Sequence, residues 1–128
     1  LPHFAYRMDH GYNRHRFWLK MGDMARTPSE YFYENVYMTF QDDWVALKLV
    51  DMLNPRRLMW ANDFPHSDST WPWGRELLLG QTGHLTEQQK AWILGDNCAE
   101  LYGIAPAGIR ADGGLETCPA EAGPTGLS

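Results

Sequence analysis

The sequence predicts an α/β fold assembled from parallel β/α units. Two short runs, residues 35–40 and 57–61, are rich in apolar, aromatic and β-branched side chains, as is typical of strands. A helical pattern follows each run, and a longer one precedes the first. Strands that alternate with helices indicate a parallel sheet covered by helices. Because two parallel strands alone leave both edges of the pair bare, we expect further strands upstream of Leu1.

The first third of the chain is expected to hold a helix, a helical turn and a strand. Apolar residues recur at helical spacing from 3 to about 19, and Pro2 suits the first turn of such a helix. Pro28 interrupts the pattern, and residues 29–32 could form one short helical turn. The first strand follows at residues 35–40.

The rest of the chain is expected to place four helical segments around a second strand. Asp42 or Asp43 can cap a helix over residues 44–53. Residues 57–61 are apolar on both sides, as expected for a strand covered on both faces. After a loop at 62–73, the expected elements are a helical piece at 75–79, a helix opened by a capping box of Thr86 and Gln89, and a helix that starts at Asp96 and ends at Gly103.

Composition limits the classes of partner. The 128 residues are 44% hydrophobic, which favours one folded domain. The net charge is −5 and no basic run exceeds two residues, so we expect no nucleic-acid partner. No apolar run is long enough to cross a bilayer and no signal-peptide pattern opens the chain, so we expect no membrane partner and a cytoplasmic location.

The composition changes at residue 105. From there to residue 128, Gly, Ala and Pro dominate without periodicity, so we expect a disordered tail at 105–128 after a folded part at 1–104. The chain starts with Leu1 and Pro2, which does not resemble a natural beginning. We therefore expect it to be a piece of a longer protein.

Asp63 is the strongest candidate for chemistry. It lies in the stretch RRLMWANDFPHSDSTWP, just beyond the second strand and before a loop with Pro65 and Pro72. In parallel α/β folds, reactive groups sit on loops at the carboxyl ends of strands. A carboxylate at this position could bind a divalent metal ion or act as a general base. It could equally cap the following turn, and spacing alone does not decide between these roles.

Three other loop residues are weaker candidates for substrate binding or for support of Asp63. His66 could take either of these roles, or it could close the loop by a hydrogen bond to Asp68 or to the backbone. Asp68 belongs to the same Pro-His-Ser-Asp stretch. Trp71, like Trp73, could stack on a substrate.

The residues present do not make a complete metal site. Such a site needs three or four ligands, and the chain has no His-x-His pair and no HExxH motif. His3, His10 and His15 lie on the first helix at spacings that do not align them on one face, so we do not expect them to bind metal. Asp42 and Asp43 follow the first strand as Asp63 follows the second. They could line the same mouth or cap the next helix.

Three segments together resemble a known family. NVYMTFQDD, RLMWANDFPHSDSTWP and ILGDNCAELYGI resemble the C-terminal part of the amidohydrolase-related proteins, over roughly residues 3–104. This metal-dependent hydrolase group includes the aminocarboxymuconate semialdehyde decarboxylase-like enzymes. The resemblance implies that the chain is the C-terminal portion of a (β/α)8 TIM barrel, about the last two β/α units plus the terminal helices. It also implies a catalytic mouth at the carboxyl ends of the strands.

The resemblance further implies a metal site to which this chain contributes one residue. In the family, the aspartate after the final strand is a metal ligand or a proton-transfer residue, and this role carries over to Asp63. The other family ligands are histidines after the first, fifth and sixth strands. Those positions have no counterpart here, and His3 does not replace them. The implied cofactor is zinc or a similar divalent ion.

For the intact protein, the resemblance implies a hydrolase. Metal-activated water would attack an amide, ester or lactone carbon of a small carbonyl or carboxylate substrate. One alternative is a nonoxidative decarboxylase, a carbon–carbon lyase. Another is a catalytically incompetent segment with only a structural or interaction role. We expect the isolated chain to be inactive and to self-associate through the apolar surface of an open barrel segment, and the intact protein could be a homo-oligomer.

Overall fold

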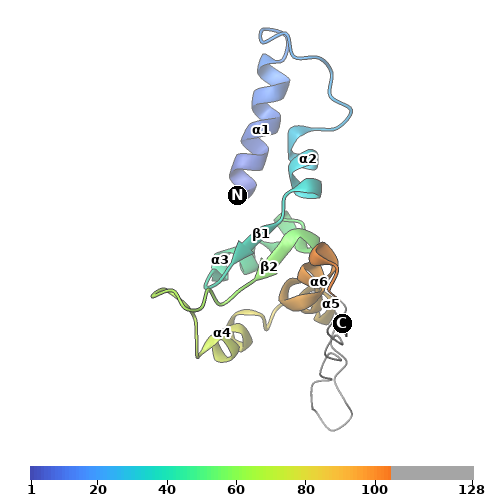
Figure 1. Cartoon of the computed structure of the whole chain (residues 1–128). Helices are drawn as coiled ribbons and strands as arrows, with labels where there is room; N and C mark the ends of the chain where they lie inside the picture. The colour runs from blue at the N-terminus through green and yellow to red at the C-terminus, as the bar shows by residue number, and fades with distance from the viewer. Residues whose placement is uncertain (105–128) are drawn as a thin grey trace, which may run out of the picture.

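The computed structural model describes residues 1–104, and the tail predicted at 105–128 lies outside the described residues. Figure 1 shows a helical arm above a small sheet that is flanked by the remaining helices. In chain order the elements are α1 (Pro2–His15), α2 (Pro28–Asn35), β1 (Met38–Phe40), α3 (Trp44–Lys48), the 3₁₀ helices η1 (Val50–Met52) and η2 (Pro55–Arg57), β2 (Leu58–Trp60), α4 (Gly74–Gln81), α5 (Glu87–Ala91), the π-helix η3 (Trp92–Asp96) and α6 (Asn97–Tyr102).

The sheet is a parallel pair, which confirms the predicted mixed α/β class. Met38 pairs with Leu58, and Phe40 pairs with Trp60. Both strands are shorter than predicted from the runs at 35–40 and 57–61. The first run loses its start because the preceding helix, α2, continues to Asn35.

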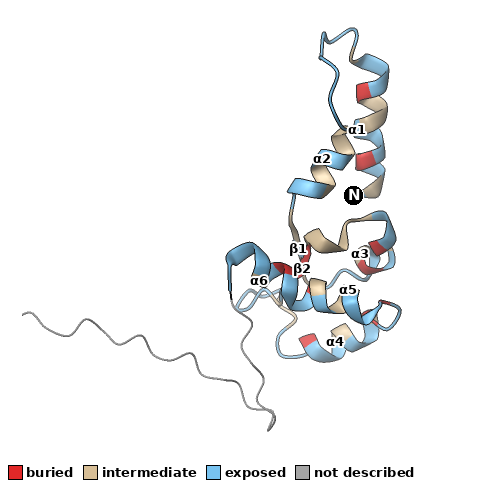
Figure 2. Cartoon of the chain, turned by 90° about the vertical axis from the view of Figure 1, so that its right-hand side faces the viewer, coloured by how far each residue is buried: buried red, intermediate tan, exposed pale blue. Residues whose placement is uncertain are grey.

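The arm consists of α1 and α2, which lie side by side and stand away from the sheet (Figures 1 and 2). Asp9 of α1 accepts hydrogen bonds from the backbone N–H and the hydroxyl of Ser29. The Tyr12 hydroxyl donates to the carbonyl of Gly22 and accepts from the N–H of Met24. These contacts fold the chain back on itself, so α1 ends at His15 and the predicted extension to residue 19 is wrong.

The second arm helix is longer than the single turn expected at 29–32. Pro28 occupies its first turn, and Thr27 and Glu30 form a reciprocal capping box at its start. The Thr27 backbone N–H and hydroxyl donate to the Glu30 carboxylate, and these hydrogen bonds lower the pKa of Glu30. A well-capped start therefore supports eight helical residues.

The helix expected over 44–53 is broken in two. Asp43 caps it as predicted, since its carboxylate accepts from the N–H of Ala46 at 2.9 Å. The backbone leaves the α region at Leu49 (φ −101°, ψ 16°) and continues as η1. This break turns Leu47 and Val50 toward the core. The side chains of Trp44, Val45 and Met52 are exposed.

The C-terminal helices form one continuous helical run, α5–η3–α6. The capping box of Thr86 and Gln89 is present, and Gly103 ends the run in the left-handed conformation (φ 64°), both as predicted. The new start predicted at Asp96 is wrong, because Asp96 has helical backbone angles and caps nothing. The π-helical segment bridges the point where the break was expected.

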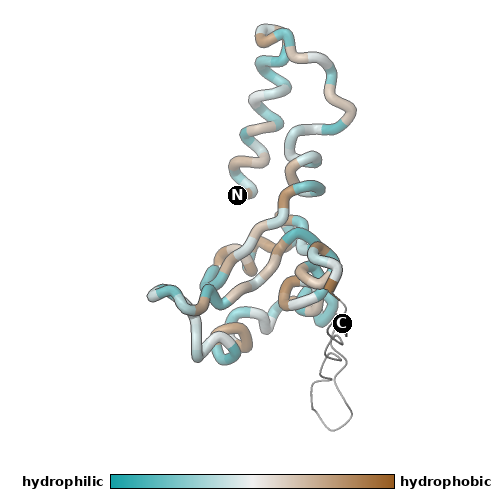
Figure 3. The backbone as a smooth tube through the Cα atoms, viewed as in Figure 1, coloured by the Kyte–Doolittle hydropathy of each residue, from teal (hydrophilic) through white to brown (hydrophobic). Residues whose placement is uncertain are grey.

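The core lies between the sheet and the helices α3 and α5–η3. It contains the buried residues Leu47, Val50, Leu58, Leu85 and Ile93, with Met38, Phe40, Leu53 and Trp60 packed against them. Figure 2 shows how few segments are buried, and Figure 3 shows hydrophobic segments both around this core and on the arm. Many large apolar side chains are exposed. Within residues 1–104, no helix is long and apolar enough to span a bilayer.

Candidate functional site

The carboxyl ends of the two parallel strands meet at one edge of the sheet. The Ala61 N–H donates to the carbonyl of Phe40 at 2.9 Å, which extends the pairing beyond the strands. The Trp60 indole N–H donates to the carbonyl of Gln41 at 3.0 Å. The loop after β2 therefore starts beside the end of β1, and Asp63 lies close to Gln41. A cavity of about 260 Å³ at this edge is lined by Thr39, Phe40, Gln41, Ala61 and Asp63.

Asp63 has an unusual backbone conformation. Its φ is +58°, in the left-handed region that few residues other than Gly, Asn and Asp adopt. The carbonyl of Asp63 accepts a hydrogen bond from the N–H of His66 at 2.9 Å, which closes a tight turn. Its side chain is 47% exposed, and the Oδ2 atom lies 2.9 Å from Nδ1 of His66. The carboxylate thus stands at the strand end, beside the cavity.

Asn62 organises the loop around Asp63. Its side-chain oxygen accepts from the N–H of Phe64, and its carbonyl accepts from the Ser69 hydroxyl at 2.7 Å and the Thr70 N–H at 3.1 Å. The Ser69 hydroxyl also accepts from the N–H of Trp71. The peptide bonds that precede Pro65 and Pro72 are cis. The loop is therefore fixed by its own polar groups, although most of its residues are exposed.

The weaker candidates His66 and Asp68 of this loop contact different partners. His66 contacts the side chain of Asp63, which fits the supporting role considered from sequence, and not that of Asp68, which was the alternative side-chain partner. Asp68 instead accepts from Nε2 of Gln41 at 3.2 Å. We call Gln41, Asp63, His66 and Asp68 the strand-end site. The sequence carries no local signal for Gln41, because its partner lies 27 residues away.

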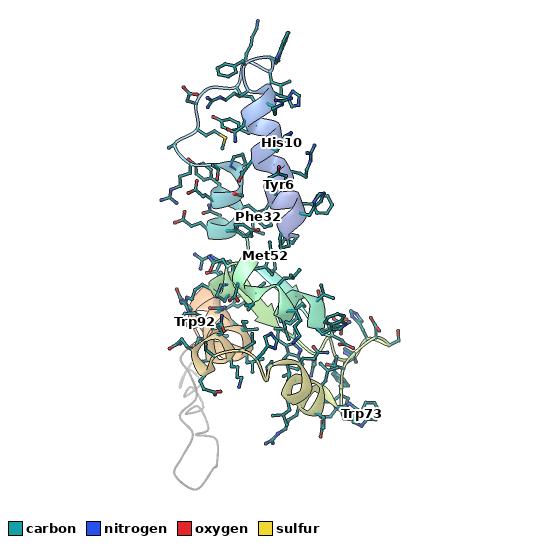
Figure 4. All side chains as sticks on the ribbon, turned by 180° about the vertical axis from the view of Figure 1, so that it is seen from behind. Tyr6, His10, Phe32, Met52, Trp73 and Trp92 are labelled. Atoms are coloured by element: carbon teal, nitrogen blue, oxygen red, sulfur yellow. The ribbon has the colours of Figure 1, made fainter. Side chains whose placement is uncertain are left out.

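The two loop tryptophans are exposed, and Trp73 lines a polar cavity that it shares with Gln41 and Asp68. Trp71 packs edge-to-face on Phe64, with ring centroids 5.9 Å apart, and lines a separate cavity of about 560 Å³ beside α4 and α5. Trp73 is 69% exposed and projects outward near the start of α4 (Figure 4). The stacking role expected for Trp71 stays a prediction.

The acidic pair after β1 is divided between two roles. Asp43 caps α3, as described above. Asp42 accepts from Nε2 of Gln81 at 2.7 Å and so ties the end of β1 to α4. With Gln41 and Asp68, Asp42 lines a polar cavity of about 360 Å³ next to the strand-end site. Together with Asp63, these carboxylates give this edge of the sheet a negative lining.

The residues present fit a divalent metal ion only in part. Within residues 1–104, no group of three His, Cys, Asp or Glu side chains is placed to hold one. Asp63 offers one carboxylate oxygen beside a cavity, which suits a hard or borderline cation. The α1 histidines lie on the arm, where His10 faces the ring of Tyr6 at 6.0 Å (Figure 4). They are not part of this site.

Comparisons with known proteins give a family and a fold. The family model described as amidohydrolase matches residues 1–104. No curated protein sequence matches the chain significantly. The crystal structure of a 5-carboxyvanillate decarboxylase from Sphingomonas paucimobilis is similar, with a TM-score of 0.68 and 24% sequence identity. The match covers 82% of this chain but only 31% of that enzyme, so the chain spans about a third of its length.

Proposed function

Because the chain belongs to the amidohydrolase family, we propose that it forms the C-terminal part of a metal-dependent hydrolase. In this proposal β1 and β2 are the last two strands of a (β/α)8 barrel, and upstream strands complete the sheet on both free edges. Asp63 supplies a metal ligand and a proton-transfer group. The substrate is a small carbonyl or carboxylate compound with an amide, ester or lactone bond.

The observation that carries the proposal is the placement of Asp63. It lies in the loop just after β2, behind Ala61 and Asn62, its backbone is left-handed, and its carboxylate stands beside a cavity at the carboxyl ends of both strands. Active sites of parallel α/β barrels lie at this end. An aspartate needed only to cap a turn would direct its oxygens to nearby backbone N–H groups. Here it is Asn62 that accepts from the following backbone, and Asp63 Oδ2 is engaged by a side chain.

The metal requires ligands from outside this chain. Asp63 would hold a divalent ion, zinc or a similar one, together with histidines of upstream strands. When bound, such an ion supplies Lewis acidity that polarises a carbonyl oxygen and makes water a better nucleophile. The chain therefore contributes one side of a site that other strands close.

The residues of the strand-end site have distinct tasks in the proposal. Asp63 accepts a proton from the attacking water and returns it to the leaving group. The hydrogen bond between Gln41 and Asp68 joins the end of β1 to the loop and so keeps Asp63 at a fixed position in the site. Asp42 and Asp68 line the adjacent cavity with negative charge. A cation bound in the assembled site would compensate this charge.

A nonoxidative decarboxylase is a second candidate. It is favoured by the structural similarity to a 5-carboxyvanillate decarboxylase. In that case Asp63 would hold the ion and give a proton to the carbon from which CO₂ leaves. The two reactions differ in their products, since hydrolysis incorporates solvent oxygen and decarboxylation releases CO₂. A catalytically incompetent segment is the third alternative.

The test of the proposal is the substitution Asp63→Asn in the intact enzyme. We expect turnover to fall by about 100-fold to 10,000-fold, the usual contribution of a positioned acid or base. Metal content by elemental analysis should fall as well, because an amide is a poorer ligand than a carboxylate. The matched control is Asp51→Asn, which removes an exposed carboxylate of η1. Normal turnover and metal content in Asp63→Asn would refute the assignment.

The same measurement on the 128-residue chain examines the third alternative. We expect the chain alone to carry no stoichiometric metal, whether Asp63 is present or replaced by Ala. Stoichiometric metal that is lost with Asp63→Ala would mean that this chain assembles a site by itself. Ligands from upstream strands would then not be needed to explain metal binding.

A further inference from the structure

We propose that His66 is a positioning residue for Asp63. Its imidazole holds one oxygen of the carboxylate, so that the other oxygen is presented in one orientation at the strand-end site. The inference rests on the proposed function, in which Asp63 is a metal ligand. It adds a residue of this chain that neither the family match nor the strand-end position of Asp63 assigns.

The geometry joins the two side chains in a single turn. The His66 N–H donates to the Asp63 carbonyl, and His66 Nδ1 lies 2.9 Å from Asp63 Oδ2. A carboxylate only accepts, so Nδ1 carries the proton in this bond. The left-handed backbone of Asp63 is what brings the two side chains to the same side of the turn, because an extended residue would direct its side chain elsewhere.

The loop does not need this contact to keep its shape. Asn62 holds both ends of the loop through its side chain and its carbonyl. The Ser69 N–H donates to the carbonyl of His66, and Gln41 fixes Asp68 from the other strand. None of these bonds involves the imidazole of His66. Within residues 1–104, the bond from His66 Nδ1 is the one hydrogen bond made to the carboxylate of the candidate ligand.

The consequence for Asp63 is a restricted carboxylate. No hydrogen bond to its Oδ1 forms within residues 1–104, so this oxygen is the one available to a cation. With Oδ2 occupied, the side chain favours one-oxygen coordination and loses less rotational freedom when a metal binds. Both side chains are accessible here, at 47% for Asp63 and 75% for His66, so water competes with their bond. The bond strengthens when upstream strands cover the site.

The test compares Zn²⁺ affinity of the intact enzyme with that of His66→Ala and His66→Asn, by competition with a chromophoric chelator. We expect a 10-fold to 100-fold loss in His66→Ala, the usual effect of removing a group that orients a ligand. His66→Asn keeps an N–H donor near the position of Nδ1 and should recover most of the affinity. Excess Zn²⁺ should restore the turnover of His66→Ala, which a loss of folding would not allow.

Ser67→Ala is the control, because Ser67 is exposed on the same loop. Unchanged Zn²⁺ affinity in His66→Ala would overturn the inference, as would equal losses in His66→Ala and His66→Asn. Asp63→Asn separates this failure from a failure of the proposed function. If Asp63→Asn loses Zn²⁺ and His66→Ala does not, only the positioning role is refuted. If Asp63→Asn keeps Zn²⁺ and turnover, the proposed function is refuted as well.

Discussion

Asn97 is the polar residue whose loss should most disturb the strand that carries Asp63. It is 1% exposed, and its side-chain amide donates to the carbonyl of Pro55 at 2.7 Å and to that of Leu58 at 2.8 Å. These bonds fasten the C-terminal helical run to the start of β2. The substitution Asn97→Ala removes both donors and leaves two carbonyl oxygens facing an apolar space.

The size of the effect follows from this geometry. Each hydrogen bond contributes about 1 kcal/mol net, and a buried polar group left without a partner costs about 1–3 kcal/mol. Asn97 Oδ1 is itself buried without a partner within residues 1–104, so the substitution also removes one unsatisfied acceptor. We therefore expect a loss of about 2 kcal/mol in the free energy of unfolding. Asn97→Asp should cost more, because a carboxylate would face the two carbonyl oxygens.

The assay is urea unfolding of the 128-residue chain, followed by tryptophan fluorescence at sub-micromolar concentration to limit self-association. With a urea slope of about 1–3 kcal/mol per molar, the midpoint should fall by roughly 1 M. Asn13→Ala removes an exposed asparagine of α1 and should change the stability by less than about 0.5 kcal/mol. An unchanged midpoint in Asn97→Ala would refute the claim that these two bonds fasten the helix to β2.

Two further predictions concern packing and pH. Gly74→Ala places a Cβ atom 3.1 Å from the Trp60 ring, which is held by its bond to Gln41, so the same unfolding assay should report a loss of about 1–3 kcal/mol. A stability equal to wild type would mean that the ring moves freely. The pKa of Glu30 lies below its ordinary 4.5, so its capping bonds to Thr27 should persist as pH falls through 4.5 and break only at lower pH. The amide chemical shift of Thr27 reports this, and movement already at 4.5 would contradict it.

Local signals allowed three of the helix ends to be predicted, because each of these depends on hydrogen bonds between near neighbours. The box of Thr86 and Gln89, the cap at Asp43 and the terminator Gly103 are all present. The break at Leu49 could not be predicted, because Trp44, Leu47 and Met52 have a helical spacing that suits one continuous helix. Which of their side chains face the core depends on where the sheet lies.

The candidate site could likewise be predicted only where its signal is local in the sequence. A carboxylate directly after an apolar strand indicates a strand-end group, and Asp63 lies there. The partner of His66 could not be chosen, since both Asp63 and Asp68 are within its reach along the chain. The left-handed backbone at Asp63 decides in favour of Asp63. The contact between Gln41 and Asp68 depends on strand pairing and has no local signal.

The arrangement of the strand-end site has a consequence for how such an enzyme would assemble. The contacts that set the position of Asp63 come from Asn62, His66 and the end of β1, all within this chain. Their geometry forms without any upstream strand, whereas the proposed enzyme would need upstream strands for a complete set of metal ligands. Folding of the β1–β2 unit can therefore fix the orientation of Asp63 before the other ligands arrive. Metal binding would then follow closure of the sheet, and the ion would add its binding energy to the contacts between this segment and the rest of the protein.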